Sequence, residues 1–77
     1  MNKAYKNFIE SLDTIKLEEE MGRLTDIAND VTLLEGMRYR AHLKYSACRL
    51  LLAWKLHNIE IYKNRYNKLW NRYQPLG

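Results

Sequence analysis

Apolar residues recur at helical spacing from the start of the chain. These residues are Tyr5, Phe8, Ile9, Leu12 and Ile15. They are three and four positions apart, as on one face of an amphipathic helix. The polar run LEEEMG follows them, and Gly22 is suited to the left-handed residue that ends many helices. The pattern predicts a first helix over about residues 3–21.

A second apolar stripe follows and continues far along the chain. Its members are Leu24, Ile27, Val31, Leu34, Ala41, Tyr45, Cys48 and Leu52. This length indicates one long helix or two consecutive ones. Gly36 and the capping-box spacing of Thr32 and Glu35 favour a restart, but one glycine inside a helix costs only about 1 kcal/mol relative to alanine. We therefore expect one continuous helix that ends near His57 and Asn58, with a break near Gly36 as the variant.

The second half of this long helix is apolar around most of its circumference. The residues that add to the stripe there are Leu43, Ala47, Leu50, Leu51 and Trp54. A helix that is apolar on most sides needs neighbours on at least two of them. The sequence therefore predicts that this helix lies in the middle of the fold, with the first and last helices beside it.

The last helix is predicted over about residues 59–74. Its apolar and aromatic residues share one arc and are Ile59, Tyr62, Tyr66, Leu69, Trp70 and Tyr73. The cations Arg65, Lys68 and Arg72 fall on a separate arc. Bases stack on rings that have cations beside them, so this segregation favours the core for the aromatic arc. A partner interface and nucleic-acid stacking stay as alternatives.

These elements predict an all-α fold, an antiparallel three-helix bundle with a long central helix, or four helices if the chain breaks near Gly36. The 77 residues make a single domain with a thin core. The expected core residues are Phe8, Leu12, Leu24, Ile27, Val31, Leu34, Cys48, Leu52, Tyr66 and Leu69. The candidate interface residues, expected to contact structure outside this chain, are Trp54, Tyr62, Trp70 and Tyr73.

Charge divides the chain into two opposite halves. Residues 1–36 hold eight acids and four bases, a net charge of −4, and residues 37–77 hold one acid and nine bases, a net charge of +8. One interpretation is an acidic helix lying beside basic ones in the same bundle. The other is a basic face for phosphates or for an acidic partner. By helical position, the cations of residues 38–55 fall on two sides, which favours separate salt bridges over one nucleic-acid groove, so nucleic-acid binding is not expected.

The sequence gives no catalytic, metal-binding or cofactor-binding residues. The single cysteine, Cys48, lies in the apolar stripe and is expected to be a buried, inert thiol. His42 and His57 are fifteen positions apart and lack the spacing of a helical metal pair. The acids of LEEEMGRLTD are expected to be solvated and ordinary. No signal-peptide run is present at the N-terminus, and the most apolar window, ACRLLLAW, is too short for a membrane helix. We expect a soluble, cytoplasmic protein.

Two stretches carry a family resemblance. LLEGMRYRAHLKYSACRLLLAW and YNKLWNRYQPLG resemble helices in the C-terminal region of glycoside hydrolase family 20-type β-N-acetylhexosaminidases. The second is similar to a closing motif in which Leu69, Trp70, Pro75 and Gly77 fall at matching places. Gln74 departs from the usual asparagine, and the segment between the two motifs is short. The resemblance covers about residues 33–77.

The resemblance implies a role without catalysis. In that family a TIM barrel carries an Asp-Glu pair, and the substrate's acetamido group is the nucleophile. Neither the barrel nor the pair is present here, so no catalytic residue carries over. The chain would be a helical C-terminal domain that packs against the missing catalytic barrel or a homodimer mate, and Met1 would not be the natural start. A free-standing basic protein-interaction module of the immunity or regulatory type is the alternative.

Overall fold

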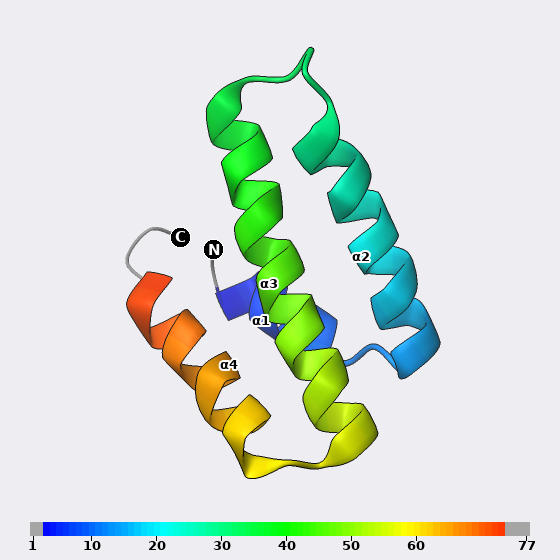
Figure 1. Ribbon diagram of the computed structural model, residues 1–77, viewed down its shortest axis with the longest axis vertical. Helices are drawn as coiled ribbons and strands as arrows, with labels where there is room; N and C mark the ends of the chain where they lie inside the picture. Colours follow the sequence, from blue (N-terminus) through cyan, green and yellow to red (C-terminus); the bar gives the residue numbers. More distant parts are fainter. Residues whose placement is uncertain (1–2, 74–77) are drawn as a thin grey trace.

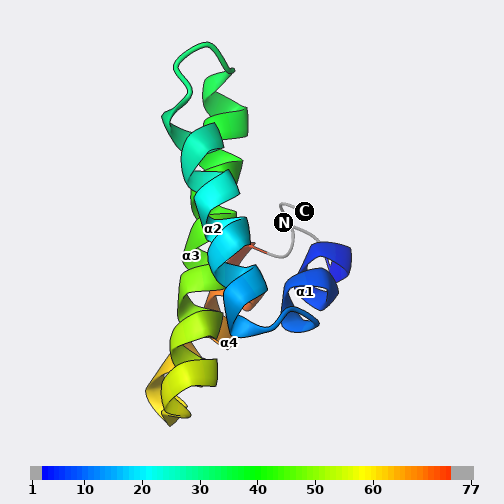
Figure 2. The same cartoon turned by 90° about the vertical axis from the view of Figure 1, so that its right-hand side faces the viewer.

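The computed structural model describes residues 3–73, which form four α-helices and no strand. The helices are α1 (Lys3–Glu10), α2 (Thr14–Asn29), α3 (Glu35–His57) and α4 (Glu60–Tyr73). Helices α2, α3 and α4 lie side by side, each antiparallel to the next, with α3 in the middle (Figure 1). Helix α1 crosses one face of this layer (Figure 2). The prediction of an all-α bundle is confirmed, in its four-helix form.

The predicted helix over residues 3–21 is wrong, because the chain turns between α1 and α2. Ser11 donates its hydroxyl to the Phe8 carbonyl at 2.6 Å and closes α1. Asp13 then caps α2 by accepting the Lys16 amide at 2.8 Å. Gly22, predicted to end the first helix, lies inside α2. Polar side chains that bind the backbone here outweigh the apolar periodicity, which continues through the turn.

The expected continuity of the second helix is also wrong, since residues 30–34 separate α2 from α3. The Asp30 carboxylate accepts the amide and the hydroxyl of Thr32 at 3.0 and 2.6 Å. Such a bond to the backbone two residues later is the mark of an Asx turn. Helix α3 starts at Glu35, and Gly36 lies in its first turn. The break therefore precedes this glycine.

The turn between α3 and α4 follows the prediction. Asn58 adopts the left-handed conformation with φ 49°, and its amide donates to the Trp54 carbonyl at 2.7 Å. Asparagine is one of the few residues besides glycine that enter this region readily. The predicted end of α3 near His57 is confirmed. The predicted end of α4 at residue 74 lies outside the described residues.

The core lies where α3 meets the other three helices. Its buried apolar residues are Ile9, Leu17, Leu24, Ala41, Ala47, Cys48, Leu51, Tyr66 and Trp70. Of the predicted core, the residues confirmed as buried are Leu24, Cys48 and Tyr66. Four more are half-buried and pack against the core: Leu12, Ile27, Leu52 and Leu69.

Three predicted core residues are exposed instead. Phe8, Val31 and Leu34 are 48%, 80% and 75% exposed. Leu34 and Val31 belong to the α2–α3 connection, where no helix directs them inward. Phe8 lies near the end of the short α1. Each misplacement follows from a helix break that the apolar spacing did not reveal.

Two cations of α3 bind the ends of the preceding helices. Lys55 donates from Nζ to the carbonyls of Glu10 and Leu12 at 3.2 and 2.5 Å. Arg38 donates from Nε to the carbonyl of Ala28 at 3.1 Å. The last carbonyls of a helix lack partners within it. Side chains from α3 thus satisfy carbonyls where α1 and α2 end.

Large apolar side chains remain exposed at both helix turns of the layer. Those around the α2–α3 turn are Val31, Leu34 and Met37, and those around the α3–α4 turn are Leu56, Ile59 and Ile61. None of the helices formed by residues 3–73 is long and apolar enough to cross a membrane.

Candidate functional site

A groove with basic walls and an apolar floor lies between α3 and α4. Leu50 of α3 and Leu69 of α4 line it together with three cations, Arg65, Lys68 and Arg72, and its volume is about 500 Å³. The cations belong to successive turns of α4, because residues three and four apart share one side of a helix. This is the cationic arc that the sequence predicted, and here it borders aliphatic side chains.

The groove continues along α3 into a second hollow of about 330 Å³. The residues lining this part are Ser46, Arg49, Leu50, Ala53, Tyr62 and Arg65. Leu50 and Arg65 belong to both hollows, so the two form one continuous surface. We call the combined surface the basic groove. Arg49 adds a fourth cation to it, this one from α3.

The basic groove and α1 lie on different sides of α3. The Tyr5 hydroxyl of α1 approaches Cys48 at 3.7 Å, and the Lys44 ammonium lies 4.7 Å from the centre of the Tyr5 ring. Leu50 and Ser46 are two residues away from Cys48 in either direction, so they project from nearly the opposite side of the helix. The groove is therefore left uncovered by the remaining helices.

The electrostatics of the basic groove are one-sided. Among the described residues, none that lines either hollow is acidic. Within residues 3–73, the side chains of Arg49, Arg65 and Lys68 make no hydrogen bond or ion pair. Their charges are therefore balanced only by solvent and salt. Arginines beside aliphatic carbon are well suited to bind carboxylates, which they can grip with two parallel hydrogen bonds.

The cations of α3 do not form the separate salt bridges that the sequence favoured. Among the described residues, none of them pairs with a carboxylate. Arg38 and Lys55 bind backbone carbonyls instead, and Lys44 lies over an aromatic ring. Arg40 lines a smaller hollow of about 230 Å³ between α2 and α3. Arg49 faces the groove. The sequence did not predict this placement, because it depends on how α4 packs beside α3.

The four candidate interface residues separate in the structure. Tyr62 is half-buried and lines the basic groove. Trp70 is only 4% exposed, which corrects the expectation that it contacts structure outside the chain, because this chain's own helices already cover it. Trp54 is half-buried, with its ring 6.3 Å from that of Tyr66 and the Lys63 ammonium 5.7 Å from its centre. The side chain of Tyr73 lies outside the described part of the structure.

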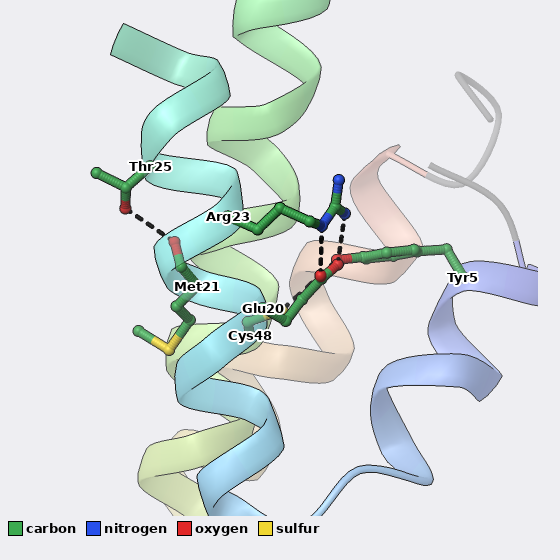
Figure 3. Close-up of polar contacts among 6 residues, drawn as sticks. All are labelled: Tyr5, Glu20, Met21, Arg23, Thr25 and Cys48. Atoms are coloured by element: carbon green, nitrogen blue, oxygen red, sulfur yellow. Dashed lines mark hydrogen bonds and ion pairs between the residues drawn. The ribbon is translucent and has the colours of Figure 1, made fainter.

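A partly buried polar cluster joins α1, α2 and α3 (Figure 3). The Tyr5 hydroxyl donates to Oε2 of Glu20 at 2.6 Å, and Arg23 donates to both Glu20 oxygens at 2.7 Å each. Glu20 is 8% exposed. The expectation of a solvated, ordinary acid is therefore wrong for Glu20. The sequence did contain a signal for this burial. Glu20 is three residues after Leu17 and four before Leu24, so it shares the buried face of α2 with them.

The ionisation of this cluster follows from its contacts. The hydrogen bonds from Arg23 hold the pKa of the Glu20 carboxyl below its usual value, with a further contribution from Tyr5. Burial raises the pKa of the Tyr5 hydroxyl far above its usual value, and the bond to Glu20 raises it further. Burial also raises the pKa of the Cys48 thiol to about 11. At neutral pH the thiol is protonated and buried, as the sequence predicted.

The chemistry available in this part of the chain favours binding over catalysis. A thiol with a raised pKa is a poor nucleophile at neutral pH, and both Glu20 oxygens already accept hydrogen bonds. Among residues 3–73, no three His, Cys, Asp or Glu side chains gather closely enough to hold a metal ion. The basic groove brings together three cations, Arg49, Arg65 and Lys68, that make no hydrogen bond or ion pair with another described residue.

Comparison with known proteins adds no name to these features. The chain matches no protein-family model, no curated protein and no solved structure at a significant level.

Proposed function

We propose that this chain is a non-catalytic helical binding domain that holds an acidic protein surface in the basic groove. The observation that carries the proposal is the set of uncommitted cations, Arg49, Arg65 and Lys68, beside the aliphatic floor of Leu50 and Leu69. An amphipathic segment would place carboxylates on these cations and apolar side chains on the floor. Helices commonly bind grooves in this way.

The groove suits protein better than nucleic acid. Base stacking requires open aromatic faces beside the cations. Tyr66 and Trp70 are buried in the core, and Leu50 and Leu69, which line the groove, are aliphatic. Among the described residues that line the groove, Tyr62 is the one aromatic residue. Apolar side chains of a protein segment fit this floor, whereas polar bases would gain little from it.

The binding test uses a fluorescein-labelled peptide designed as a stable amphipathic helix, with leucines on one face and glutamates on both flanks. We expect its fluorescence anisotropy to rise with the full chain, and the affinity to fall steeply as salt is added. Arg65→Glu should weaken binding at least about tenfold, as expected when like charges meet across an interface. Arg40→Glu is the matched control and should leave binding unchanged, because Arg40 lies outside the groove.

Competing ligands make this test decisive. The same titration is repeated with a lysine version of the peptide, with single-stranded DNA and with phosphatidylglycerol vesicles. Tight binding of the glutamate peptide alone supports the proposal. Equal effects of Arg65→Glu and Arg40→Glu, or tighter binding of DNA or vesicles than of the peptide, would overturn it.

The exposed apolar side chains at the two turns favour a second candidate, in which the chain packs against a larger protein. Val31 and Leu34 are 80% and 75% exposed, and exposed apolar patches often mark interfaces. The resemblance to β-N-acetylhexosaminidases would make this larger protein a catalytic barrel of the same parent chain. The gene on both sides of these 77 codons provides the test. An upstream frame with alternating strands and helices and an Asp-Glu pair would support this role, and a free-standing gene would contradict it.

A further inference from the structure

Helix α2 lies at the edge of the layer farthest from α4 (Figure 1), and its outer side is acidic. Glu18, Glu19 and Asp26 are exposed there, and Ile15 beside them is 66% exposed. Residues at these spacings share one side of a helix. The opposite side of α2 buries Leu17, Glu20 and Leu24. We call the outer side the acidic face.

Gly22 lies in the middle of the acidic face without an internal reason for being glycine. A Cβ atom added there would meet nothing within 4 Å. The residue is helical, so no left-handed backbone requires it either. Glycine inside a helix is less favourable than alanine. Its effect is to let another molecule come close to the α2 backbone.

The acidic face is complementary to the basic groove in charge. Three carboxylates and one exposed isoleucine on α2 face outward, while four cations border an aliphatic floor in the groove. From Ile15 to Asp26 the face extends about 16 Å at 1.5 Å per residue. The cations from Arg65 to Arg72 extend about 10 Å along α4 by the same rise, and Arg49 widens the set across α3.

We propose that the acidic face of one molecule binds the basic groove of a second copy of this chain. The inference rests on the proposed function of the groove and names its occupant. In the complex Ile15 contacts the Leu50 and Leu69 floor, and the carboxylates of Glu18 and Asp26 pair with the arginines and the lysine. Glu19, which forms an ion pair with Lys16 at 3.4 Å in the single molecule, exchanges that partner for a cation of the groove. The exposed Gly22 backbone lets the two helices approach closely.

The geometry of such a complex is head to tail. Because the acidic face and the groove are different surfaces of one molecule, a bound pair still has one free surface of each kind: one copy keeps its acidic face and the other keeps its groove. Such heterologous contacts build rings or open chains instead of closed two-fold dimers. Since opposite charges hold the copies together, association weakens as salt is added.

Sedimentation velocity of the full chain tests the proposal. We expect the mean sedimentation coefficient to rise with protein concentration at about 20 mM salt, and this rise to disappear at about 500 mM salt. Two variants separate the surfaces. The acid-face variant carries Glu18→Lys, Glu19→Lys and Asp26→Lys, and the groove variant carries Arg65→Glu and Lys68→Glu. Each variant alone is expected to stay monomeric, with helical content and thermal unfolding like those of the wild type.

Mixing the two variants gives the decisive result. The acid-face variant retains a basic groove and the groove variant retains an acidic face, so an equimolar mixture should associate again. Restored association supports head-to-tail binding. Association of the acid-face variant alone, or no association in the mixture, overturns it. A wild-type chain that stays monomeric but still binds the glutamate peptide removes the second-copy inference and leaves the proposed function standing; binding of neither removes both.

Discussion

The hydroxyl of Tyr5 donates to Oε2 of Glu20 at 2.6 Å and links the short α1 to α2. The two residues are fifteen positions apart, on separate helices. Helix α1 has only eight residues, far fewer than an isolated helix needs for stability in water. This bond, the nearby Cys48 thiol and the buried Ile9 side chain therefore hold α1 on the layer.

Replacing Tyr5 with phenylalanine should lower the free energy of unfolding by about 1.5–3 kcal/mol, the range for a hydrogen bond to a charged group. Glu20 would keep its two bonds from Arg23. Urea unfolding followed by circular dichroism measures the change. Tyr39→Phe is the control, because Tyr39 is 53% exposed and a surface change of this kind stays within about 0.5 kcal/mol. Equal effects of the two changes would mean that the Tyr5 bond does not hold α1.

The lowered pKa of Glu20 predicts sensitivity to acid. The unfolded chain takes up this proton more readily than the folded chain, so the stability that the Glu20 carboxylate contributes is present above about pH 4.5. It is lost as the pH falls through the lower folded pKa. The test measures urea midpoints between neutral pH and about pH 3. Glu20→Gln should be less stable than the wild type at neutral pH, and this difference in stability should shrink as the pH falls. Glu18→Gln is the control and should follow the wild-type curve, because the Glu18 carboxylate is exposed. If Glu20→Gln were less stable than the wild type by the same amount at every pH, the linkage would be contradicted.

The raised pKa of Cys48 predicts a loss of stability in alkali. The unfolded chain gives up the thiol proton first, so stability falls from about pH 9 towards the folded pKa of about 11. The expected loss is on the order of 2 kcal/mol. Urea midpoints from about pH 8 to about pH 10 should fall less for Cys48→Ala than for the wild type. Below about pH 10 the tyrosines contribute little, because the loss from Tyr5 and Tyr66 begins only near the unfolded tyrosine pKa of about 10 and continues towards their raised folded values. Parallel curves for the variant and the wild type would exclude Cys48 as the source.

Lys55 predicts a local effect on α1. Lys55→Met removes the donor to the carbonyls of Glu10 and Leu12, at an expected cost of about 1 kcal/mol. Hydrogen exchange should speed up in α1 more than in α4. Lys68→Met is the matched control, because Lys68 makes no hydrogen bond or ion pair with another described residue. Uniform acceleration across all helices would show that the contact acts on the whole fold instead.

Gly22 predicts opposite effects on folding and on association. Gly22→Ala should raise the free energy of unfolding by about 0.5–1 kcal/mol, because alanine is the better helix residue and the added methyl group meets open space. The same methyl group should weaken self-association. Gly36→Ala is the comparison. A methyl group added at Gly36 would also meet open space, but Gly36 lies in α3, away from the acidic face. Unchanged association for Gly22→Ala would argue against close contact at α2.

The sequence predicted the helical class because apolar spacing is a direct record of helix periodicity. It predicted the Asn58 turn because the apolar stripe of α3 stops there. The two missed breaks have a common cause: the apolar spacing continues in phase through Ser11–Asp13 and through residues 30–34. Only the short polar side chains of Asp13 and Asp30, which bind the nearby backbone, mark the turns. Such local bonds compete with helix continuation and leave no trace in periodicity.

The candidate site was only half predictable. The arc formed by Arg65, Lys68 and Arg72 follows from α4 alone. The position of Arg49 beside them depends on how α3 and α4 pack, and the burial of Trp70 depends on the same packing. The pairing of Tyr5 with Glu20 requires the turn before Asp13, which reverses α1 onto α2. The pattern along a single helix therefore could not predict which residues of different helices come into contact.

The bonds from Lys55 and Arg38 impose an order on folding during synthesis. A ribosome makes α1 and α2 before either cation exists, so the carbonyls of Glu10, Leu12 and Ala28 must remain bonded to water until α3 follows. The nascent first half also lacks the α3 surface that covers Leu17 and Leu24. Helix α3 thus supplies the contacts that α1 and α2 lack by themselves, and we expect their native packing to form only after residues 35–57 have left the ribosome.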